Sequence, residues 1–136
     1  MREPAVGDTA HVEGIVGPDD LATVVGRAPT DSFPPVFATS RMIAWMEVAG
    51  ARVLQRALQD GELSVGVSVD VNHTAATAAG ETVVATARYV GREGKLFVFD
   101  VSARDAAGEI GKGTHKRAIV DPARLVASAA KRKSGK

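Results

Sequence analysis

The sequence predicts an α+β domain in which an antiparallel sheet packs against one long helix. Two observations support this fold class. Residues 41–59 read as a continuous helix whose first half is apolar on nearly every side, so that half should be buried nearly all round. After it, the chain reads as strand-length segments separated by short turns, and one segment alternates polar and apolar residues strictly. A buried helix followed by a run of strands is typical of the α+β class.

The residues before the helix predict a short strand and a long loop. Residues 9–16 mix polar and apolar types as a short strand does, and residues 18–20, Pro-Asp-Asp, predict a turn. Residues 21–25 fit either a weak strand or a single helical turn. Residues 27–35 are rich in Pro, Thr, Asp and Ser and predict a loop, in which Phe33 must be extended because it precedes a proline.

One carboxylate stands out within the predicted helix. Thr39 and Ser40 are good N-cap types for this helix, and residues 60–61, Asp-Gly, end it. Glu47 is the only ionisable side chain in residues 42–51. A carboxylate there costs free energy unless something pairs with it or uses it. The Glu47 side chain either points to solvent from a single polar position on the helix or belongs to a functional site, because carboxylates with perturbed pKa values cluster at such sites.

Four strands are predicted after the helix. They are expected at residues 65–71, 82–90, 96–104 and 109–120. The connections between them are short and hold glycines, as hairpin connections do. We therefore predict a meander in which each strand pairs with the next one along the chain.

Composition limits the classes of function. At 136 residues the chain fits one domain, and its net charge of +1 argues against a protein that holds a nucleic-acid backbone. The absence of cysteine excludes a disulfide scaffold, a thiolate zinc site and a cysteine nucleophile. No apolar stretch approaches the ~18 residues of a membrane helix. The N-terminus does not resemble a secretory signal, so we expect a cytoplasmic protein without a membrane partner, a metal or a cofactor.

The end of the chain is basic. Residues 127–136 close with Lys-Arg-Lys-Ser-Gly-Lys. We expect a frayed, solvated tail without fixed structure. The alternative is that this basic tail touches an anionic partner.

Three residue types used in acyl transfer occur at informative places. Thr39, at the start of the helix, is either a cap or the residue beside one, or it is a functional hydroxyl next to unpaired N–H groups and a positive dipole end. Such a helix end would stabilise a carbonyl oxygen that turns anionic. His73 lies at the end of the predicted strand that alternates Val65, Val67, Val69 and Val71 with polar residues and glycine. A loop of small residues follows it, and a side chain at such a place can be rigid yet reachable. Taken singly, each of the three histidines, His73 included, fits a hydrogen-bonded structural role, and His115 shares a strand face with Arg117. A hydroxyl, an imidazole and a carboxylate are the groups that acyl transfer uses.

Four segments carry a resemblance to a known family. They are Phe33-Pro34-Pro35-Val36-Phe37-Ala38-Thr39, Met46-Glu47, Val71-Asn72-His73-Thr74-Ala75-Ala76-Thr77 and Gly111-Lys112-Gly113-Thr114-His115-Lys116-Arg117-Ala118. With their spacing kept from about Val6 to Val126, they resemble the fluoroacetyl-CoA thioesterase family, whose members are hotdog-fold acyl-CoA hydrolases.

The resemblance implies a single hotdog domain over residues 1–126, in which a curved antiparallel sheet wraps around the long helix. It implies that a homodimer, with its active site at the subunit interface, hydrolyses a short-chain acyl-CoA to the free acid and CoA. Selectivity for fluoroacetyl-CoA and further pairing into tetramers stay open. One alternative is a non-catalytic hotdog protein that binds acyl-CoA. A hotdog hydratase or dehydratase would usually carry a histidine on the helix, which this helix lacks.

Carried over by position, the resemblance assigns roles to six residues. Thr39, Glu47 and His73 are the catalytic set, Arg117 an active-site arginine, Gly66 a glycine that lines the acyl pocket, and Phe33 an aromatic lid. Arg117 could pair with Glu47 or hold the phosphate end of the substrate.

Two questions about the catalytic set stay open: whether its three residues meet within one subunit, and which group attacks the thioester. Thr39 and Glu47 lie about 12 Å apart along a helix axis. One imidazole could just bridge them within a subunit; otherwise His73 meets one of them across the dimer interface. The nucleophile is Thr39, Glu47 or a water that His73 activates.

Overall fold

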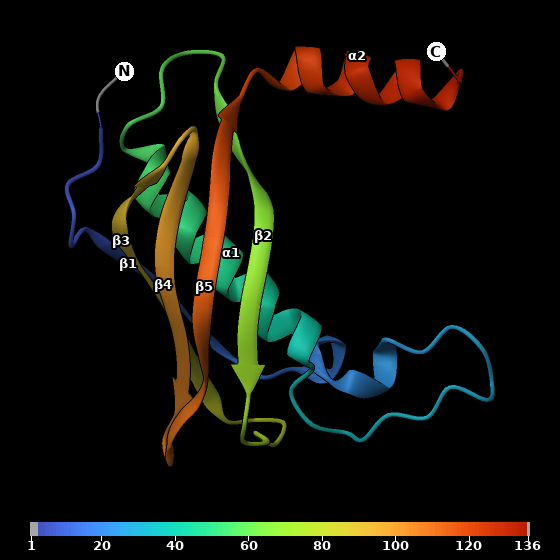
Figure 1. Cartoon of the computed structure of the whole chain (residues 1–136). Coiled ribbons are helices and arrows are strands. Elements are labelled where there is room, and N and C mark those ends of the chain that lie inside the picture. The colour runs from blue at the N-terminus through green and yellow to red at the C-terminus, as the bar shows by residue number, and fades with distance from the viewer. Residues whose placement is uncertain (1–2, 136) are drawn as a thin grey trace.

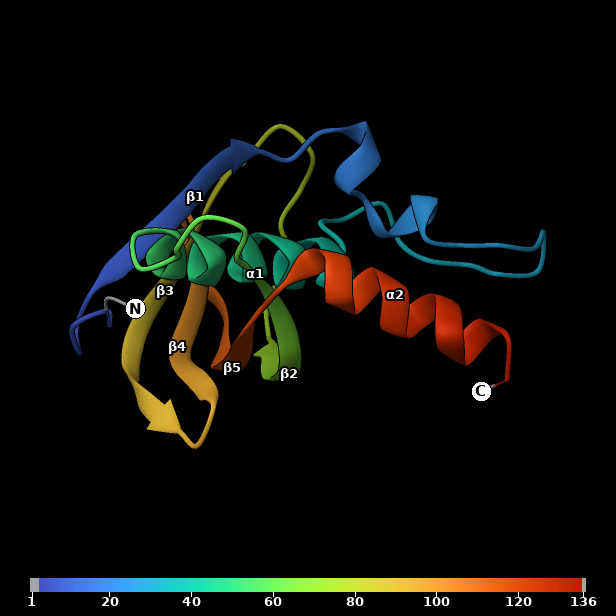
Figure 2. The ribbon, with the colours of Figure 1, turned by 90° about the horizontal axis from the view of Figure 1, so that it is seen from above.

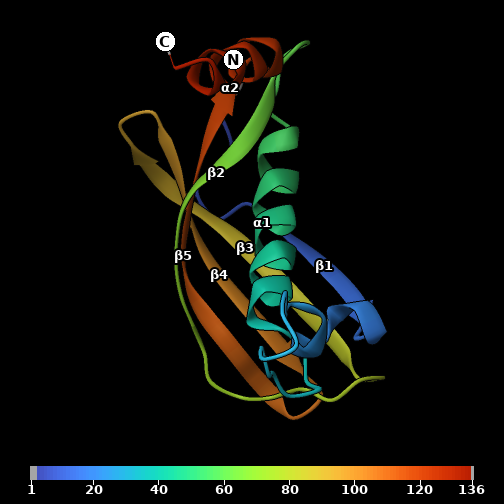
Figure 3. The ribbon, with the colours of Figure 1, turned by 90° about the vertical axis from the view of Figure 1, so that its right-hand side faces the viewer.

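The computed structural model describes residues 3–135 and has the predicted α+β architecture (Figure 1). A five-stranded antiparallel sheet curves around one long helix, and a second helix lies outside it (Figure 3). The elements in chain order are β1 (Thr9–Ile15), η1 (Pro18–Asp20), η2 (Ala22–Val24), α1 (Thr39–Gln55), β2 (Leu63–His73), β3 (Thr82–Glu93), β4 (Leu96–Asp105), β5 (Gly108–Val120) and α2 (Pro122–Lys133). Among the two options for residues 21–25, the short helix η2 is the one observed.

The core forms between α1 and the concave face of the sheet. The buried face of α1 presents Met42, Met46, Ala49 and Val53, which recur at the three- and four-residue spacing of one helix face. Alternate residues of the sheet meet this face, because successive side chains of a strand point to opposite sides. They are Val83, Ala85, Ala87 and Tyr89 of β3 and Phe97, Phe99, Val101 and Ala103 of β4.

Two predictions about α1 need correction. The helix begins at Thr39 and ends at Gln55, whereas the sequence predicted residues 41–59. Its first half is also not buried on all sides, since Val48 is exposed and Glu47 is half-buried. The physical reason is that the sheet covers only one side of the helix, and among the described residues Val48 on the other side stays exposed.

The predicted meander is right for β3, β4 and β5 and wrong for β2. The strand order is β1-β3-β4-β5-β2, so β2 pairs with β5 and not with β3. Residues 74–81 do not form a hairpin; Thr77 accepts a backbone hydrogen bond from Phe37, and Ala78 bridges to Val36. This connection therefore crosses from one side of the sheet to the other. As a result β2 is an edge strand with one side open in the described chain.

The basic end of the chain is helical, which corrects the expectation of a disordered tail. Helix α2 runs to Lys133, and only Lys136 of the predicted tail lies outside the described residues. Asp121 caps the helix by accepting hydrogen bonds from the N–H groups of Ala123 and Arg124, and Pro122 occupies its first position. The predicted domain boundary at residue 126 falls inside this helix. In Figure 2, α2 extends away from the body of the molecule, beyond β2.

Within residues 3–135, no helix is long and apolar enough to cross a membrane.

The buried face of β4 gives a direct test of the core. Phe99 is fully buried against the core, so we expect Phe99→Ala to lower the free energy of unfolding by about 3–5 kcal/mol. Val6→Ala, at an exposed residue before β1, should change it by less than about 0.5 kcal/mol. Urea denaturation followed by circular dichroism measures both. Equal effects of the two substitutions would contradict this assignment of the core.

Candidate active site

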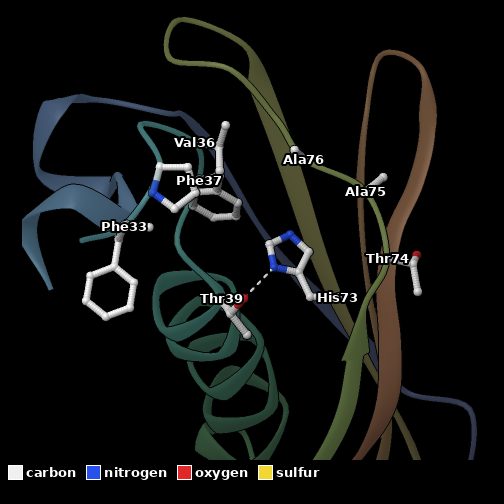
Figure 4. A pocket seen from close by; sticks show the side chains of 10 residues that line it. Phe33, Val36, Phe37, Thr39, His73, Thr74, Ala75 and Ala76 are labelled. Atoms are coloured by element: carbon white, nitrogen blue, oxygen red, sulfur yellow. Dashed lines mark hydrogen bonds between the residues drawn. The ribbon is translucent and has the colours of Figure 1, made fainter. Parts of the chain in front are cut away.

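The start of α1 and the end of β2 bring a hydroxyl and an imidazole together. Thr39 Oγ1 lies 2.7 Å from His73 Nδ1, although the two residues are 34 positions apart (Figure 4). The N-cap of α1 is Ala38, so Thr39 is not the cap but the residue beside it. Thr39 is instead the first helical residue, and its hydroxyl is engaged with the histidine.

His73 has one ring nitrogen to spare. Its Nε2 is buried and has no hydrogen-bond partner among the described residues. Burial lowers the pKa of His73, so the neutral imidazole dominates at pH 7. A neutral imidazole has one donor and one acceptor nitrogen. If the Thr39 hydroxyl donates to Nδ1, then Nε2 carries the hydrogen. The backbone of Ala75, which raises the pKa against the larger effect of burial, is a group that can accept a hydrogen bond from this imidazole.

A mostly apolar cavity opens beside this pair. Its volume is about 380 Å³, and no lysine or arginine lines it. Its walls are Ala22 of η2, the loop residues Phe33, Pro34, Val36 and Phe37, and Thr39, His73, Thr74, Ala75 and Ala76 (Figure 4). Phe33 is 46% exposed and stands at the rim. The cavity is thus a small apolar space with one hydroxyl and one imidazole at its side.

A second polar cluster lies further along α1, around a buried arginine. Arg117 Nε donates to Ser64 Oγ and Nη2 donates to the Ser64 carbonyl oxygen, both at 3.0 Å. Arg117 Nη1 lies 3.6 Å from Glu47 Oε1. Burial lowers the pKa of Arg117 and the Glu47 carboxylate opposes that shift. Because a buried charge needs partners, these contacts explain how the guanidinium is tolerated at 6% exposure.

His115 holds the other side of the guanidinium. Its Nδ1 lies 2.9 Å from the Ser68 carbonyl oxygen, which can only accept, so Nδ1 carries the hydrogen. Its Nε2 is then the acceptor for the N–H of Arg117, at 3.1 Å. Burial, with a smaller contribution from Arg117, lowers the pKa of His115 and keeps it neutral. The structural role expected for His115 is thus the support of Arg117, and the strand face that the two residues share is the sequence signal that links them.

Gly66 leaves room for the Glu47 carboxylate. A Cβ at Gly66 would overlap Glu47 Oε1 and come within 3.2 Å of His115 Cε1. The cavity beside Thr39 is not lined by Gly66 in the single chain. The contact with Glu47 gives a physical reason for a glycine here, while its part in binding an acyl group stays a prediction.

The two clusters remain separate within one chain. His73 pairs with Thr39, Glu47 pairs with Arg117, and no hydrogen bond joins Glu47 to His73 in the part of the chain that the structure describes. The arrangement in which a single imidazole bridges Thr39 and Glu47 inside one subunit is therefore not the one observed.

The two buried histidines predict a pH dependence of stability. Burial lowers the pKa of both His73 and His115 below the unfolded value of about 6.5. The unfolded chain therefore binds more protons than the folded one in acid, and this stabilisation is complete above about pH 6.5 and lost as the pH falls below it. We expect the melting temperature to drop between about pH 7 and pH 5.

Melting curves of two histidine variants test this origin. His115→Asn should reduce the size of the drop, because the fully buried group that resists protonation is gone. His11→Asn, at an exposed histidine on β1, is the matched control and should keep it. If the drop in His115→Asn is as large as in the wild type, His115 is not a source of the pH dependence.

Comparison with known proteins identifies the family. The family model described as fluoroacetyl-CoA-specific thioesterase matches residues 16–123. The fluoroacetyl-CoA thioesterase of Streptantibioticus cattleyicolor is 47% identical over 88 residues, which are 65% of this chain and 63% of that protein. The chain thus spans less than two thirds of the length of this curated relative.

Solved structures agree with the sequence comparison. One structure of a fluoroacetyl-CoA thioesterase has a TM-score of 0.89 at 36% identity and covers 96% of this chain and 98% of that one. A variant of that enzyme has been solved with acetyl-CoA. A hot-dog-like protein from Thermanaerovibrio acidaminovorans has a TM-score of 0.80 at 25% identity, over 93% of this chain and 91% of that one. The fold is the hotdog fold, and the chain belongs to the fluoroacetyl-CoA-specific thioesterase family.

Proposed function

We propose that this protein is a thioesterase that hydrolyses a short-chain acyl-CoA to the free acid and CoA. The observation that carries the proposal is the Thr39–His73 hydrogen bond beside a small apolar cavity at the start of α1. The names of its relatives, which are thioesterases for fluoroacetyl-CoA, support the same reaction class. Which acyl group is preferred stays open.

The chemistry needs a base, an oxyanion site and a proton for the leaving group. A neutral His73 takes a proton from the Thr39 hydroxyl or from water, and the resulting oxygen attacks the thioester carbonyl. The first helical hydrogen bonds of α1 are donated by Arg41 and Met42 to the Ala38 carbonyl. The N–H groups of Thr39 and Ser40 precede these bonds and donate none of them. These N–H groups and the helix dipole are suited to hold the oxyanion.

The second half of the reaction breaks the carbon–sulfur bond. The protonated His73 returns its proton to the CoA sulfur, which leaves as the thiol. If Thr39 attacked first, water then cleaves the acyl-threonine ester with His73 again as the base, and the acid is released. If water attacked directly, the acid is formed in one addition and elimination. Either route consumes one water molecule, and each proton transfer in it is carried out by His73.

In the proposed homodimer, Glu47 of one subunit acts on His73 of the other. Strand β2 has an open edge with exposed Leu63, Val67 and Val69, and such an edge favours pairing with another strand. We assign this edge to a second copy of the chain, with the two β2 strands antiparallel. Glu47 lies against Gly66 of β2, so it faces the partner in this arrangement. We assign to the partner's Glu47 the orientation of the His73 imidazole and the stabilisation of its charged form.

The contacts of Arg117 favour an ion-pair role over a phosphate-binding role. Its three nitrogens are already engaged with Ser64, His115 and Glu47, and its side chain is buried. We assign to it the orientation of the Glu47 carboxylate. Phe33 stands at the cavity rim, and we assign to it the role of covering the acyl group and excluding water.

Thiol release from a series of acyl-CoA esters tests the activity. We expect turnover of acetyl-, fluoroacetyl- or propionyl-CoA, and a loss of about 10²–10⁴-fold in kcat for His73→Ala, because a general base contributes about that much. Thr39→Ala should lose activity as well, whereas Thr74→Ala, a matched substitution at the cavity wall, should lose less than about tenfold. Binding of all these esters without any turnover would favour the non-catalytic alternative.

Mixed dimers test the shared site. Subunits carrying Glu47→Ala and subunits carrying His73→Ala are each expected to be inactive. In an equal mixture, half of the dimers are hybrids with one intact site, so about a quarter of the wild-type activity should return. Mixing Thr39→Ala with His73→Ala subunits is the control and should restore nothing, because these two residues meet within one chain. Failure of the first mixture to recover activity, in dimers verified by light scattering, would place Glu47 and His73 in one subunit.

A further inference from the structure

Helix α2 has no buried residue in the part of the chain that the structure describes. It is 12 residues long, and every described side chain from Ala123 onward is exposed. An isolated helix of about 12–15 residues is only marginally stable in water. One of its sides nevertheless carries Leu125 and Val126, which are 45% and 69% exposed. The helix thus presents an apolar strip with nothing to cover it in the single chain.

The fold fixes where this helix points. Helix α2 follows Val120, the residue of β5 that pairs with Leu63 at the start of the edge strand β2. From there it extends past the open edge of β2, as Figures 1 and 2 show. The helix therefore occupies the space into which the proposed dimer brings the second copy.

Antiparallel pairing of the two β2 edges determines what α2 meets there. When such pairing is centred on the strand, it sets the start of one β2 strand beside the end of the other. The start is Leu63, next to the root of α2, and the end is His73, at the cavity. Helix α2 of one subunit thus comes to the cavity of the partner, and its apolar strip has a surface to cover.

The charge of α2 complements the substrate proposed for that cavity. The helix carries Arg124, Lys131, Arg132 and Lys133, has no acidic residue, and takes part in no salt bridge of residues 3–135. The cavity itself has no lysine or arginine in its lining. CoA has several phosphate groups at the end remote from the thioester, and these need cationic partners. From Arg124 to Lys133 the helix extends about 14 Å, a length that suits the extended CoA chain.

We propose that α2 of each subunit lies at the mouth of the partner's cavity and binds the phosphate groups of the CoA substrate. The inference rests on the thioesterase and dimer proposed above. It makes α2 a substrate-binding element that acts in trans, and it assigns a role to the basic end of the chain. The reacting atoms are not touched by α2, so it should affect substrate affinity and leave the chemical step alone.

Removal of the positive charges tests phosphate binding. The variant Lys131→Gln, Arg132→Gln, Lys133→Gln should raise KM for acetyl-CoA by about tenfold or more, with kcat nearly unchanged. The control substrate is S-acetyl-pantetheine, which has the thioester but no phosphate, and its kcat/KM should not change. The control variant Arg88→Gln, Arg104→Gln, Lys112→Gln removes three exposed cations from the sheet and should leave KM for acetyl-CoA as in the wild type.

The substrate pair separates the two proposals. Turnover of S-acetyl-pantetheine by the wild type reports the thioesterase site alone. If neither ester is hydrolysed, the proposed function fails. If both are hydrolysed and the α2 variant keeps its KM for acetyl-CoA, only the role of α2 is overturned.

A hybrid dimer tests the action in trans. The α2 variant, whose own His73 is intact, is mixed with a large excess of His73→Ala subunits that carry a wild-type α2. All activity then comes from cavities of the α2 variant that face a wild-type α2 of the partner. We expect KM for acetyl-CoA to return to the wild-type value. A KM that stays as high as in the pure α2 variant would show that α2 serves its own chain and would overturn the proposal.

Discussion

The structure depends on the packing of α1 into a sheet that reaches only part of the way around it. The buried side of the helix is fixed by large side chains such as Met42 and Met46 against the strands. Where β5 comes closest, the helix has Gly50; a Cβ there would lie 3.3 Å from Arg117 Cδ and 3.4 Å from His115 Cδ2. Small residues at Gly50 and Gly66 therefore let α1 lie close to the polar cluster. The same packing sets the start of α1 beside the end of β2, where Thr39 meets His73.

The polar cluster shows how a charge can be kept inside this fold. Arg117 is buried, and leaving any one of its N–H groups without an acceptor would cost free energy. The neutral tautomer of His115, fixed by the Ser68 carbonyl, provides one acceptor, and Ser64 provides two more. The remaining electrostatic partner is Glu47, whose side chain is still 40% exposed. The cluster thus fixes the arginine firmly and leaves the carboxylate oriented but accessible, as a group that must serve a second site would need to be.

The sequence was sufficient for the parts of the fold that local patterns determine. Helix α1 follows from its apolar composition and β2 from two-residue periodicity, while β3 to β5 follow from strand-length segments between short turns, all within a few residues at their ends. The order of the strands does not, because nothing local distinguishes a hairpin from the crossing made by residues 74–81. Helix α2 was missed because a run of lysine and arginine suggests a solvated tail, while the cap at Asp121 and the first-turn Pro122 favour a helix. For the site, spacing along α1 could not pair Thr39 with His73, since that contact joins elements 34 residues apart.

Three incomplete features of the single chain lie on the same side of it. The open edge of β2 and the exposed Val48 of α1 are neighbours, since Val48 and Leu63 line one surface hollow. Helix α2 follows Val120, the β5 residue that pairs with that same Leu63, and it passes beyond the edge of the sheet. An unpaired strand edge, exposed valines and an unsupported helix would each be unfavourable in an isolated monomer. One contact with a second copy would cover all three at once and would bring the partner's Glu47 towards His73. The dimer proposed here is therefore a condition for a complete catalytic site and not only a route to greater stability.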